Sequence, residues 1–323
     1  MTVTTSLETP IYFDAGGDDL FGIFTRPDVE PNGIAVLTIF GAGPFPTLGK
    51  NQARVRLARG LAGLGYHALR IDYRGIGESG GEAREPKLSE LWIEDVRGAI
   101  GWLTAQGFDR ILIVGVCFGA RTALAMLDEI PGLVGMAMVA PPVGEANHRE
   151  SIIAQPISWY LKRALSPSAV RLVIGSDASA KRRRATLTAR ARRAVGREET
   201  PNATPKAAHA SPQFLEPMAA LLGSRTPVLL LYGRGDDFFA SFERSLDGRL
   251  GRLIEEAGST MTLHVAEEPL AGLGSIETQD MVLDEVLDFA RKVAAAQDPL
   301  VAQNLSVAQH TSQPKEQGGL RLD

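Results

Sequence analysis

One stretch near the middle of the chain, residues 111–124, limits the folds that this sequence can adopt. It begins with an unbroken run of aliphatic residues, passes at once into Gly-Val-Cys-Phe-Gly, and continues with small and apolar residues at helical spacing. An apolar run of this length predicts a buried parallel strand, because both faces of such a strand are covered. Gly115 and Gly119 allow a sharp turn and a close approach of the helix that follows.

The residue between these glycines, Cys117, is the first candidate for chemistry. A strand, a tight turn and a helix form the context of the G-x-S-x-G nucleophile elbow, here with cysteine in place of serine. We expect the turn to expose the thiol at the carboxyl edge of the sheet, beside a helix N-terminus that favours a thiolate. The alternative is a small buried cysteine at a turn, since free cysteine is usually a core residue.

Alternating strand and helix patterns on both sides of this stretch predict a mostly parallel, doubly wound α/β sheet. Residues 11–26 are typical of a β-hairpin. Further strands are expected at 34–40, 66–71, 133–140, 227–232 and 261–266, and helices at 51–64, 88–104, 242–257 and 278–295. We assign residues 10–142 and 223–296 to this α/β core.

The alternation breaks down between residues 143 and 222, which we interpret as a mainly helical cap or lid over the carboxyl edge of the sheet. This segment contains Trp159 and Tyr160, which are candidate substrate-binding residues, and a basic run at 181–184. The basic run either forms a solvated helix face or attracts an anionic substrate such as a carboxylate or a phosphopantetheine. Residues 297–323 are polar and are predicted to be a disordered tail.

Composition excludes several classes of protein. With 44% hydrophobic residues the chain can form a large core, and a net charge of −4 argues against a general nucleic-acid binder. The single cysteine rules out an internal disulfide and fits a reducing compartment, so we expect a cytoplasmic protein. The sequence shows no signal peptide, no membrane-spanning stretch and no metal-ligand pattern, and it indicates no cofactor. It does not indicate an oligomeric state.

Three motifs, in this order along the chain, resemble those of the α/β-hydrolase fold. They are residues 72–79 (Asp-Tyr-Arg-Gly-Ile-Gly-Glu-Ser), residues 115–119, and residues 232–237 (Tyr-Gly-Arg-Gly-Asp-Asp). The resemblance covers about residues 10–296 and places the insertion in the cap position of the family. Residues 49–124 are most similar to the serine-aminopeptidase-like branch, and the cysteine in the elbow also resembles that of exosortase-associated hydrolases.

This resemblance implies a role for individual residues. Cys117 becomes the nucleophile, and the backbone N–H groups of Phe118 and Ala42 become the oxyanion donors. Asp236 matches the acid of the family and Asp237 is the alternative. Two aspartates after a strand are also ordinary turn chemistry.

The chain departs from the family at the histidine, which the family places in the loop after the last strand. That loop, residues 267–275, contains none, and the nearest histidine, His264, lies inside the preceding strand. His264 is either the base of a shortened triad or a structural residue. At about 3.3 Å per residue it lies about one or two residues too far from the carboxyl end of the strand. We therefore favour a site of Cys117 and Asp236 without histidine.

The chemistry that these residues favour is acyl transfer. A cysteine depends less on a neighbouring base than a serine does, because part of the thiol is already ionised near neutrality. We expect a hydrolase or acyl transferase that acts on an ester or thioester, carried by a small molecule or by a carrier protein. Phe40, before the oxyanion turn, is a candidate substrate-binding residue. The alternatives are a lyase or cyclase on the same fold and an inactive ligand-binding homologue.

Overall fold

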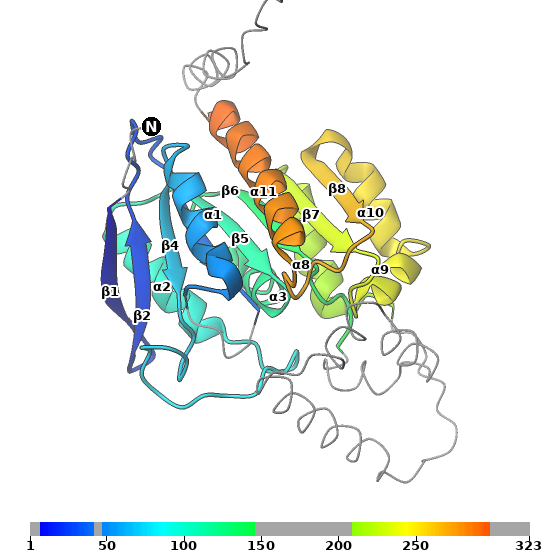
Figure 1. Ribbon diagram of the computed structural model, residues 1–323. Coiled ribbons are helices and arrows are strands. Elements are labelled where there is room, and N and C mark those ends of the chain that lie inside the picture. The colour runs from blue at the N-terminus through cyan, green and yellow to red at the C-terminus, as the bar shows by residue number, and fades with distance from the viewer. Residues whose placement is uncertain (1–6, 42–46, 146–208, 298–323) are drawn as a thin grey trace, which may run out of the picture. The chain divides into compact units, whose positions relative to one another are not determined.

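In this computed structural model the described residues are 7–41, 47–145 and 209–297, and they contain one eight-stranded sheet. Its strand order is β1-β2-β4-β3-β5-β6-β7-β8 (Figure 1). The strands are β1 (Glu8–Ala15), β2 (Asp18–Thr25), β3 (Ala35–Ile39), β4 (His67–Ile71), β5 (Ile111–Val116), β6 (Leu133–Val139), β7 (Val228–Gly233) and β8 (Met261–Ala266). The β1–β2 and β2–β4 pairs are antiparallel, and all the other pairs are parallel.

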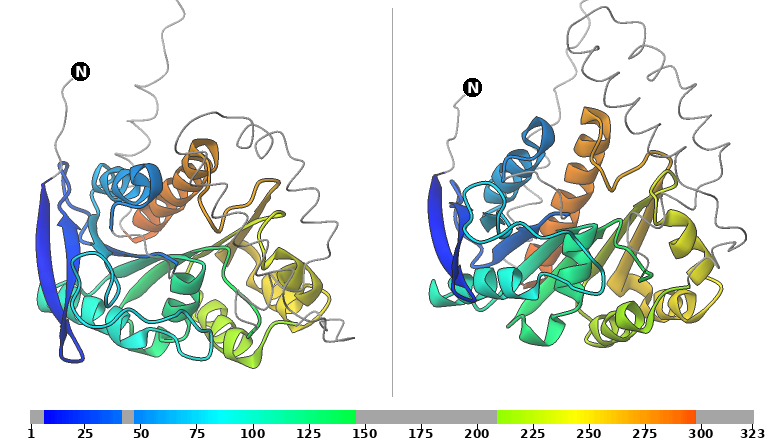
Figure 2. Two further views of the ribbon diagram at one scale, coloured as in Figure 1. Left: turned by 60° about the horizontal axis from the view of Figure 1, so that its bottom comes forward. Right: turned by 90° about the horizontal axis from the view of Figure 1, so that it is seen from below.

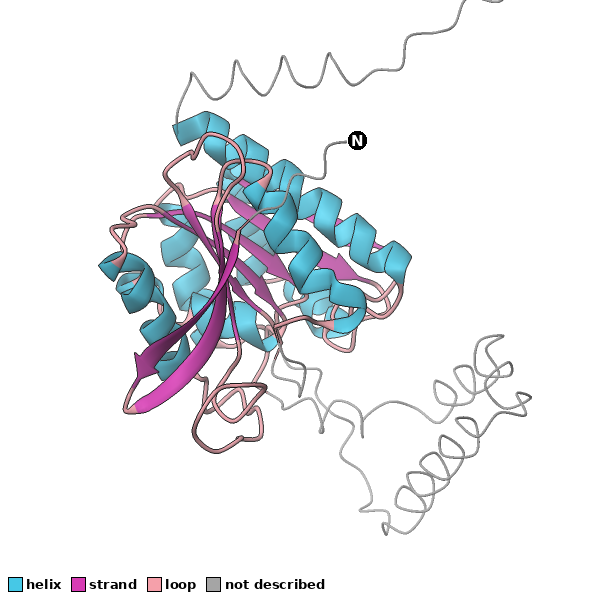
Figure 3. Ribbon diagram, turned by 60° about the vertical axis from the view of Figure 1, so that its left-hand side comes forward, coloured by secondary structure: helices cyan, strands magenta, loops and turns pink. Residues whose placement is uncertain are grey.

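Helices cover both faces of this twisted sheet (Figure 3). Two lie side by side on one face, α1 (Ala53–Ala62) and α11 (Ile276–Gln297) (Figure 2). The opposite face carries α2 (Ile93–Ala105), α3 (Phe118–Leu124), α8 (Pro212–Gly223), α9 (Phe239–Ser245) and α10 (Arg249–Ala257). Short 3₁₀ turns occupy Lys50–Gln52, Leu127–Glu129 and Gly258–Thr260.

The central strand β5 shows why the predicted apolar run forms a strand buried on both faces. Its side chains alternate between two hydrophobic clusters, as the two-residue period of a strand requires. Ile111 and Ile113 face the layer of α2, α3 and α8, whereas Leu112, Val114 and Val116 face α1 and α11. All of these side chains are buried, so an aliphatic residue is favoured at each position.

The predicted α/β sheet is confirmed, and the differences lie in the helices. The helix expected at 242–257 is two helices, α9 and α10, because the chain turns at Leu246–Gly248 between them. α2 starts at Ile93, five residues later than the expected helix at 88–104. The residues before it form a turn closed by a bridge between Lys87 and Glu90.

The α/β core resumes earlier than we expected after the insertion. It starts again at His209, and α8 buries Phe214 and Met218 in the same cluster as the sheet. The expected cap at 143–222 therefore included α8, which belongs to the core. The sequence hid this because its alternating strand and helix patterns stop well before α8. Residues 146–208 and the tail at 298–323 lie outside the described residues.

Candidate active site

The chain makes its sharpest turn at Cys117, directly after β5. Cys117 has φ 52° and ψ −118°, a left-handed conformation that side chains other than glycine adopt at a cost of about 1–3 kcal/mol. Its backbone N–H donates to the carbonyl oxygen of Val139 at 2.7 Å, and α3 begins at the next residue. The predicted strand, turn and helix are thus all present, with the cysteine at the turn.

The glycines on either side are required by close backbone contacts. A Cβ atom on Gly115 would lie 2.5 Å from the Cα atom of Ala120, and one on Gly119 would lie 2.3 Å from the carbonyl oxygen of Ile39. Both obstacles are backbone atoms, which cannot rotate away as the end of a side chain can. This turn therefore requires glycine at both positions of the Gly-x-Cys-x-Gly pattern.

The surroundings of the thiol oppose its ionisation. Cys117 is half-buried, and the pKa of its thiol is raised to about 12, chiefly by burial. A hydrogen bond from the backbone N–H of Phe118 opposes this rise, and the negative charges of Asp236 and Asp237 contribute to it. The described surroundings of Cys117 therefore oppose the thiolate that the helix N-terminus was expected to favour.

The rate of alkylation by iodoacetamide should therefore rise about tenfold per pH unit between about pH 7 and 10, since the thiolate fraction grows tenfold per unit below the pKa. The chain has one cysteine, so total labelling, followed by mass spectrometry, reports on Cys117 alone. The urea-unfolded chain is the control, and its rate should level off near the ordinary pKa of a thiol. A plateau below about pH 8 in the folded protein would show a base that activates Cys117.

Asp236 is an anchor between two loops. Its Oδ1 accepts the backbone N–H groups of Leu270 and Ala271, each at 2.7 Å, and its Oδ2 accepts that of Gly233 at 2.7 Å. The carboxyl group is buried, and burial raises its pKa against the opposing effect of these N–H groups. The loop after β8, from which the family resemblance implies a histidine, thus presents its own backbone to the acid.

The structure does not bring His264 to the thiol. His264 lies on β8 opposite Leu231 of β7, and its Nδ1 atom is 2.7 Å from Oε1 of Glu285 on α11. β8 is three strands away from β5 in the sheet. Because neighbouring strands are about 4.8 Å apart, this separates the two strands by about 14 Å. The position of His264 fits a surface pair with Glu285.

The two phenylalanines that the resemblance singled out have different surroundings. The ring of Phe40 is buried beneath the guanidinium of Arg54, which lies 4.5 Å from the ring centroid, so Phe40 is a core residue and does not line an open pocket. Phe118 directs its backbone N–H to the sulfur of Cys117 and packs its ring against Trp92 at 5.1 Å. The other candidates, Ala42, Trp159 and Tyr160, lie outside the described residues.

One cluster beside the site was not predicted. Arg121 on α3 is buried and donates to Oε1 of Glu145 at 2.7 Å and to the carbonyl oxygen of Gln213 at 2.6 Å. The hydroxyl of Ser211 donates to the same Glu145 oxygen at 2.5 Å. These contacts join the two chain segments that flank residues 146–208. A charged residue inside a helix of small and apolar residues was the available signal, since a buried charge needs a partner.

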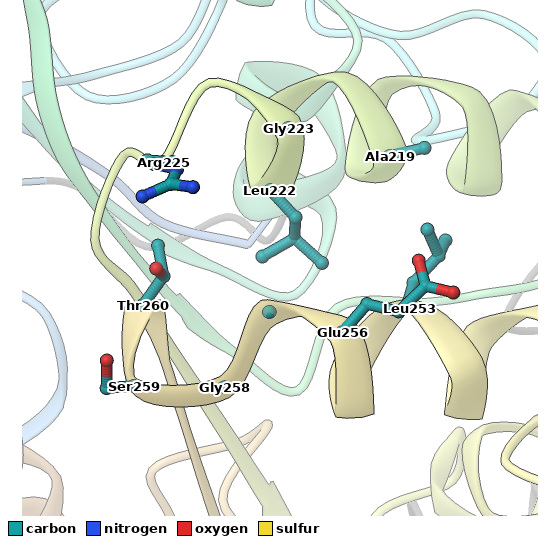
Figure 4. Close-up of a pocket in the computed structure, with 10 residues that line it drawn as sticks. Ala219, Leu222, Gly223, Arg225, Leu253, Glu256, Gly258, Ser259 and Thr260 are labelled. Atoms are coloured by element: carbon teal, nitrogen blue, oxygen red, sulfur yellow. The ribbon is translucent and has the colours of Figure 1, made fainter.

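A surface pocket of about 480 Å³ lies elsewhere, between α8, α10 and the turn before β8 (Figure 4). Its wall combines Leu222 and Leu253 with Arg225 and Glu256. These residues precede β7 and β8, so the pocket lies at the amino ends of these strands, whereas Cys117 follows the carboxyl end of β5. Its lining contains no cysteine or histidine, and we do not place the active site there.

Among the described residues, no three His, Cys, Asp or Glu side chains gather as a metal site requires. None of the described helices is both long and apolar enough to cross a membrane.

Several solved structures are similar to this chain in fold and have low sequence identity to it. An esterase of Pyrococcus furiosus matches with a TM-score of 0.58 and 15% identity over 90% of this chain and 92% of its own. The esterase domain of a Rhodothermus marinus protein matches with a TM-score of 0.52 and 17% identity, over 88% and 99%. A proline iminopeptidase of Mycobacterium smegmatis matches with a TM-score of 0.52 and 14% identity, over 90% and 100%. The sequence matches none of the curated proteins with which it was compared.

The strand order, the elbow at Cys117 and these likenesses define an α/β hydrolase. Residues 51–268 match the family described as serine aminopeptidase, S33, and the chain belongs to that hydrolase family. The name of the family implies a serine in the elbow, where this chain holds Cys117.

Proposed function

We propose that this hydrolase uses Cys117 to attack the carbonyl carbon of an ester or thioester, carried by a small molecule or by a carrier protein. The observation that carries the proposal is the elbow, which holds the sulfur at the turn with the backbone N–H of Phe118 beside it. A backbone donor in this position stabilises the oxyanion of a tetrahedral intermediate. Two of the similar structures are named as an esterase and an esterase domain, which supports the same bond type.

The reaction proceeds in two steps. The sulfur bonds to the carbonyl carbon, the thiol proton leaves with the departing alcohol or thiol, and an acyl-thioenzyme remains. Water, or another acceptor, then releases the acyl group. Because the pKa of the thiol is about 12 and His264 is paired with Glu285, this site suits a reactive thioester better than a stable amide.

Trapping of the acyl-enzyme tests this proposal. The protein is mixed with butyryl-N-acetylcysteamine, quenched in acid within seconds and digested, and the peptide with Cys117 is weighed. We expect a butyryl adduct on that peptide, and no adduct on the corresponding peptide of Cys117→Ala. The 3-hydroxybutyryl thioester, which carries a leaving group at the β carbon, is tested in parallel. An unsaturated product from it without any adduct would contradict the proposal and support the lyase alternative.

The raised thiol pKa also favours a second candidate, an inactive homologue that binds an acyl compound without turnover. The same experiment separates the two, because a binding protein forms no adduct and releases no free thiol from the substrate. The single thiol fits a reducing compartment, so our proposal places the protein in the cytoplasm.

We further propose that residues 146–208 form the lid that selects the substrate. Replacing them by a Gly-Ser linker of about eight residues should change the free energy of unfolding by no more than about 2 kcal/mol, since each halving of the length between fixed ends changes the closure entropy by about 0.6 kcal/mol. The ends are fixed because the N–H of Ser211 donates to the carbonyl oxygen of Val143 at 2.8 Å. Urea unfolding measures the stability. The ratio of kcat/KM for long and short acyl thioesters should change at least about tenfold, and an unchanged ratio would exclude the lid from selection.

A further inference from the structure

Tyr73, which follows β4, restrains a backbone segment that lies close to Cys117. The residue is buried, and its hydroxyl donates to the carbonyl oxygen of Phe40 at 2.9 Å. β3 and β4 are parallel neighbours, so Phe40 and Tyr73 lie at the same edge of the sheet. Because a buried carbonyl without a partner is costly, this bond keeps Phe40 in one position.

The residue after Phe40 touches the elbow. A Cβ atom on Gly41 would lie 3.4 Å from the Cβ atom of Cys117 and 3.7 Å from the carbonyl oxygen of Val116. The backbone of Gly41 therefore lies directly against the nucleophile. A shift of Phe40 carries Gly41 with it and changes what stands beside the sulfur.

Asp72, beside Tyr73, holds the chain at Thr47. The backbone N–H of Thr47 donates to the Asp72 carboxylate and lowers the pKa of that group, while burial raises it. The carbonyl oxygen of Thr47 accepts a bond from Arg70 at 3.0 Å. Residues at the end of β4 thus hold the chain at two points, Phe40 and Thr47. Phe40 immediately precedes Gly41 in the sequence, and Thr47 follows it by six residues.

The ring of Tyr73 reaches the other side of the thiol. It packs edge-to-face on Trp92 with the centroids 4.7 Å apart, and Trp92 packs in the same way on Phe118 at 5.1 Å. Phe118 is the residue whose backbone N–H lies at the sulfur. A single side chain therefore restrains Gly41 through its hydroxyl and Phe118 through its ring.

We propose that Tyr73, with Asp72 beside it, is a positioning residue that fixes the backbone on both sides of Cys117 for stabilisation of the oxyanion. An oxyanion donor is effective only within about 2.7–3.1 Å of the developing charge, so a small shift of the backbone weakens it. This inference rests on the proposed function, because the position of the donor affects the rate only if Cys117 forms a tetrahedral intermediate.

The test is Tyr73→Phe, which keeps the ring contacts and removes the hydroxyl. We expect kcat for a butyryl thioester to fall about tenfold to a hundredfold, with KM unchanged within about twofold. This decrease in kcat is smaller than that caused by complete removal of an oxyanion donor. Alkylation of Cys117 by iodoacetamide forms no oxyanion, and its rate should stay within about twofold. A lower kcat at an unchanged alkylation rate is a result that general destabilisation does not give.

Tyr66→Phe is the matched control. Tyr66 precedes β4, is equally buried, and donates its hydroxyl to the carbonyl oxygen of Ala290 at 2.7 Å, at the opposite end of the strand from Tyr73. This variant loses the same kind of bond and should keep its kcat. The proposal is overturned if both variants lose kcat equally, or if Tyr73→Phe slows alkylation as much as turnover.

Asp72→Asn repeats the test at the Thr47 end with a side chain of the same size, and decides the matter if Tyr73→Phe does not fold. It should show the same split between kcat and alkylation, and an unchanged kcat would overturn the proposal. Cys117→Ala separates this inference from the proposed function. If that variant keeps its turnover, the proposed function is wrong, whereas an inactive Cys117→Ala together with an unimpaired Tyr73→Phe rejects only the positioning role.

Discussion

Turnover of ester and thioester substrates should fall at least about a thousandfold in Cys117→Ala, the scale expected when the nucleophile of a covalent mechanism is removed. Alanine has no atom that can bond to the acyl carbon, and it keeps the backbone of the elbow. The measurement is kcat/KM for butyryl thioesters, with circular dichroism and thermal unfolding to show that the fold is intact. Normal turnover in this variant would refute covalent catalysis by Cys117.

Cys117→Ser is the sharper companion, because it changes only one atom. A serine hydroxyl needs a general base, which contributes about a hundredfold to ten-thousandfold, and His264 is engaged by Glu285 three strands away. We therefore expect the serine variant to be nearly as inactive as the alanine variant. A serine variant as active as the parent would show that a base reaches residue 117 after all.

Asp236→Ala should lower the free energy of unfolding by about 3 kcal/mol, because it leaves three backbone N–H groups, two of them buried, without an acceptor. Urea unfolding measures this change. The control is Asp284→Ala on the exposed surface of α11, which should stay within about 0.5 kcal/mol. Asp236 binds Leu270 and Ala271 in the folded protein, so its loss should free the loop after β8.

Asp236→Asn distinguishes an anchor from a catalytic acid. The amide keeps one acceptor oxygen, so it should retain part of the stability that alanine loses. If Asp236 is only an anchor, activity should follow the fraction of folded protein. Full stability combined with a thousandfold loss of kcat would instead show that the carboxylate takes part in the reaction.

The parts of the fold that the sequence predicted are those that depend on short-range patterns. β5 and the elbow were predictable because a continuous apolar run indicates a buried strand and two glycines four residues apart indicate a tight turn. α8 was assigned to the insertion because its buried residues, Phe214 and Met218, have a helical pattern that fits either place. The chain turn before α10 was missed because the apolar spacing continues across it.

The site was less predictable, since its chemistry depends on contacts between residues far apart in the chain. The sequence places Asp236 after a strand, as a catalytic acid requires, but does not show that Leu270 and Ala271 occupy one of its oxygens. In the same way, the high pKa of Cys117 follows from burial by several elements, which no local motif records. The motif therefore predicts where the sulfur lies, whereas the pKa of the thiol depends on the tertiary structure.

The left-handed backbone at Cys117 has a consequence for how such a site changes during evolution. The turn requires glycine at positions 115 and 119 and a positive φ at residue 117. It accepts either a hydroxyl or a thiol at the end of the side chain of residue 117. Serine and cysteine are thus interchangeable for the architecture and unequal for the chemistry, because sulfur needs less help from a base. A lineage that exchanged oxygen for sulfur first could lose its histidine later and keep some reactivity at every step. The reverse order would pass through an inactive protein.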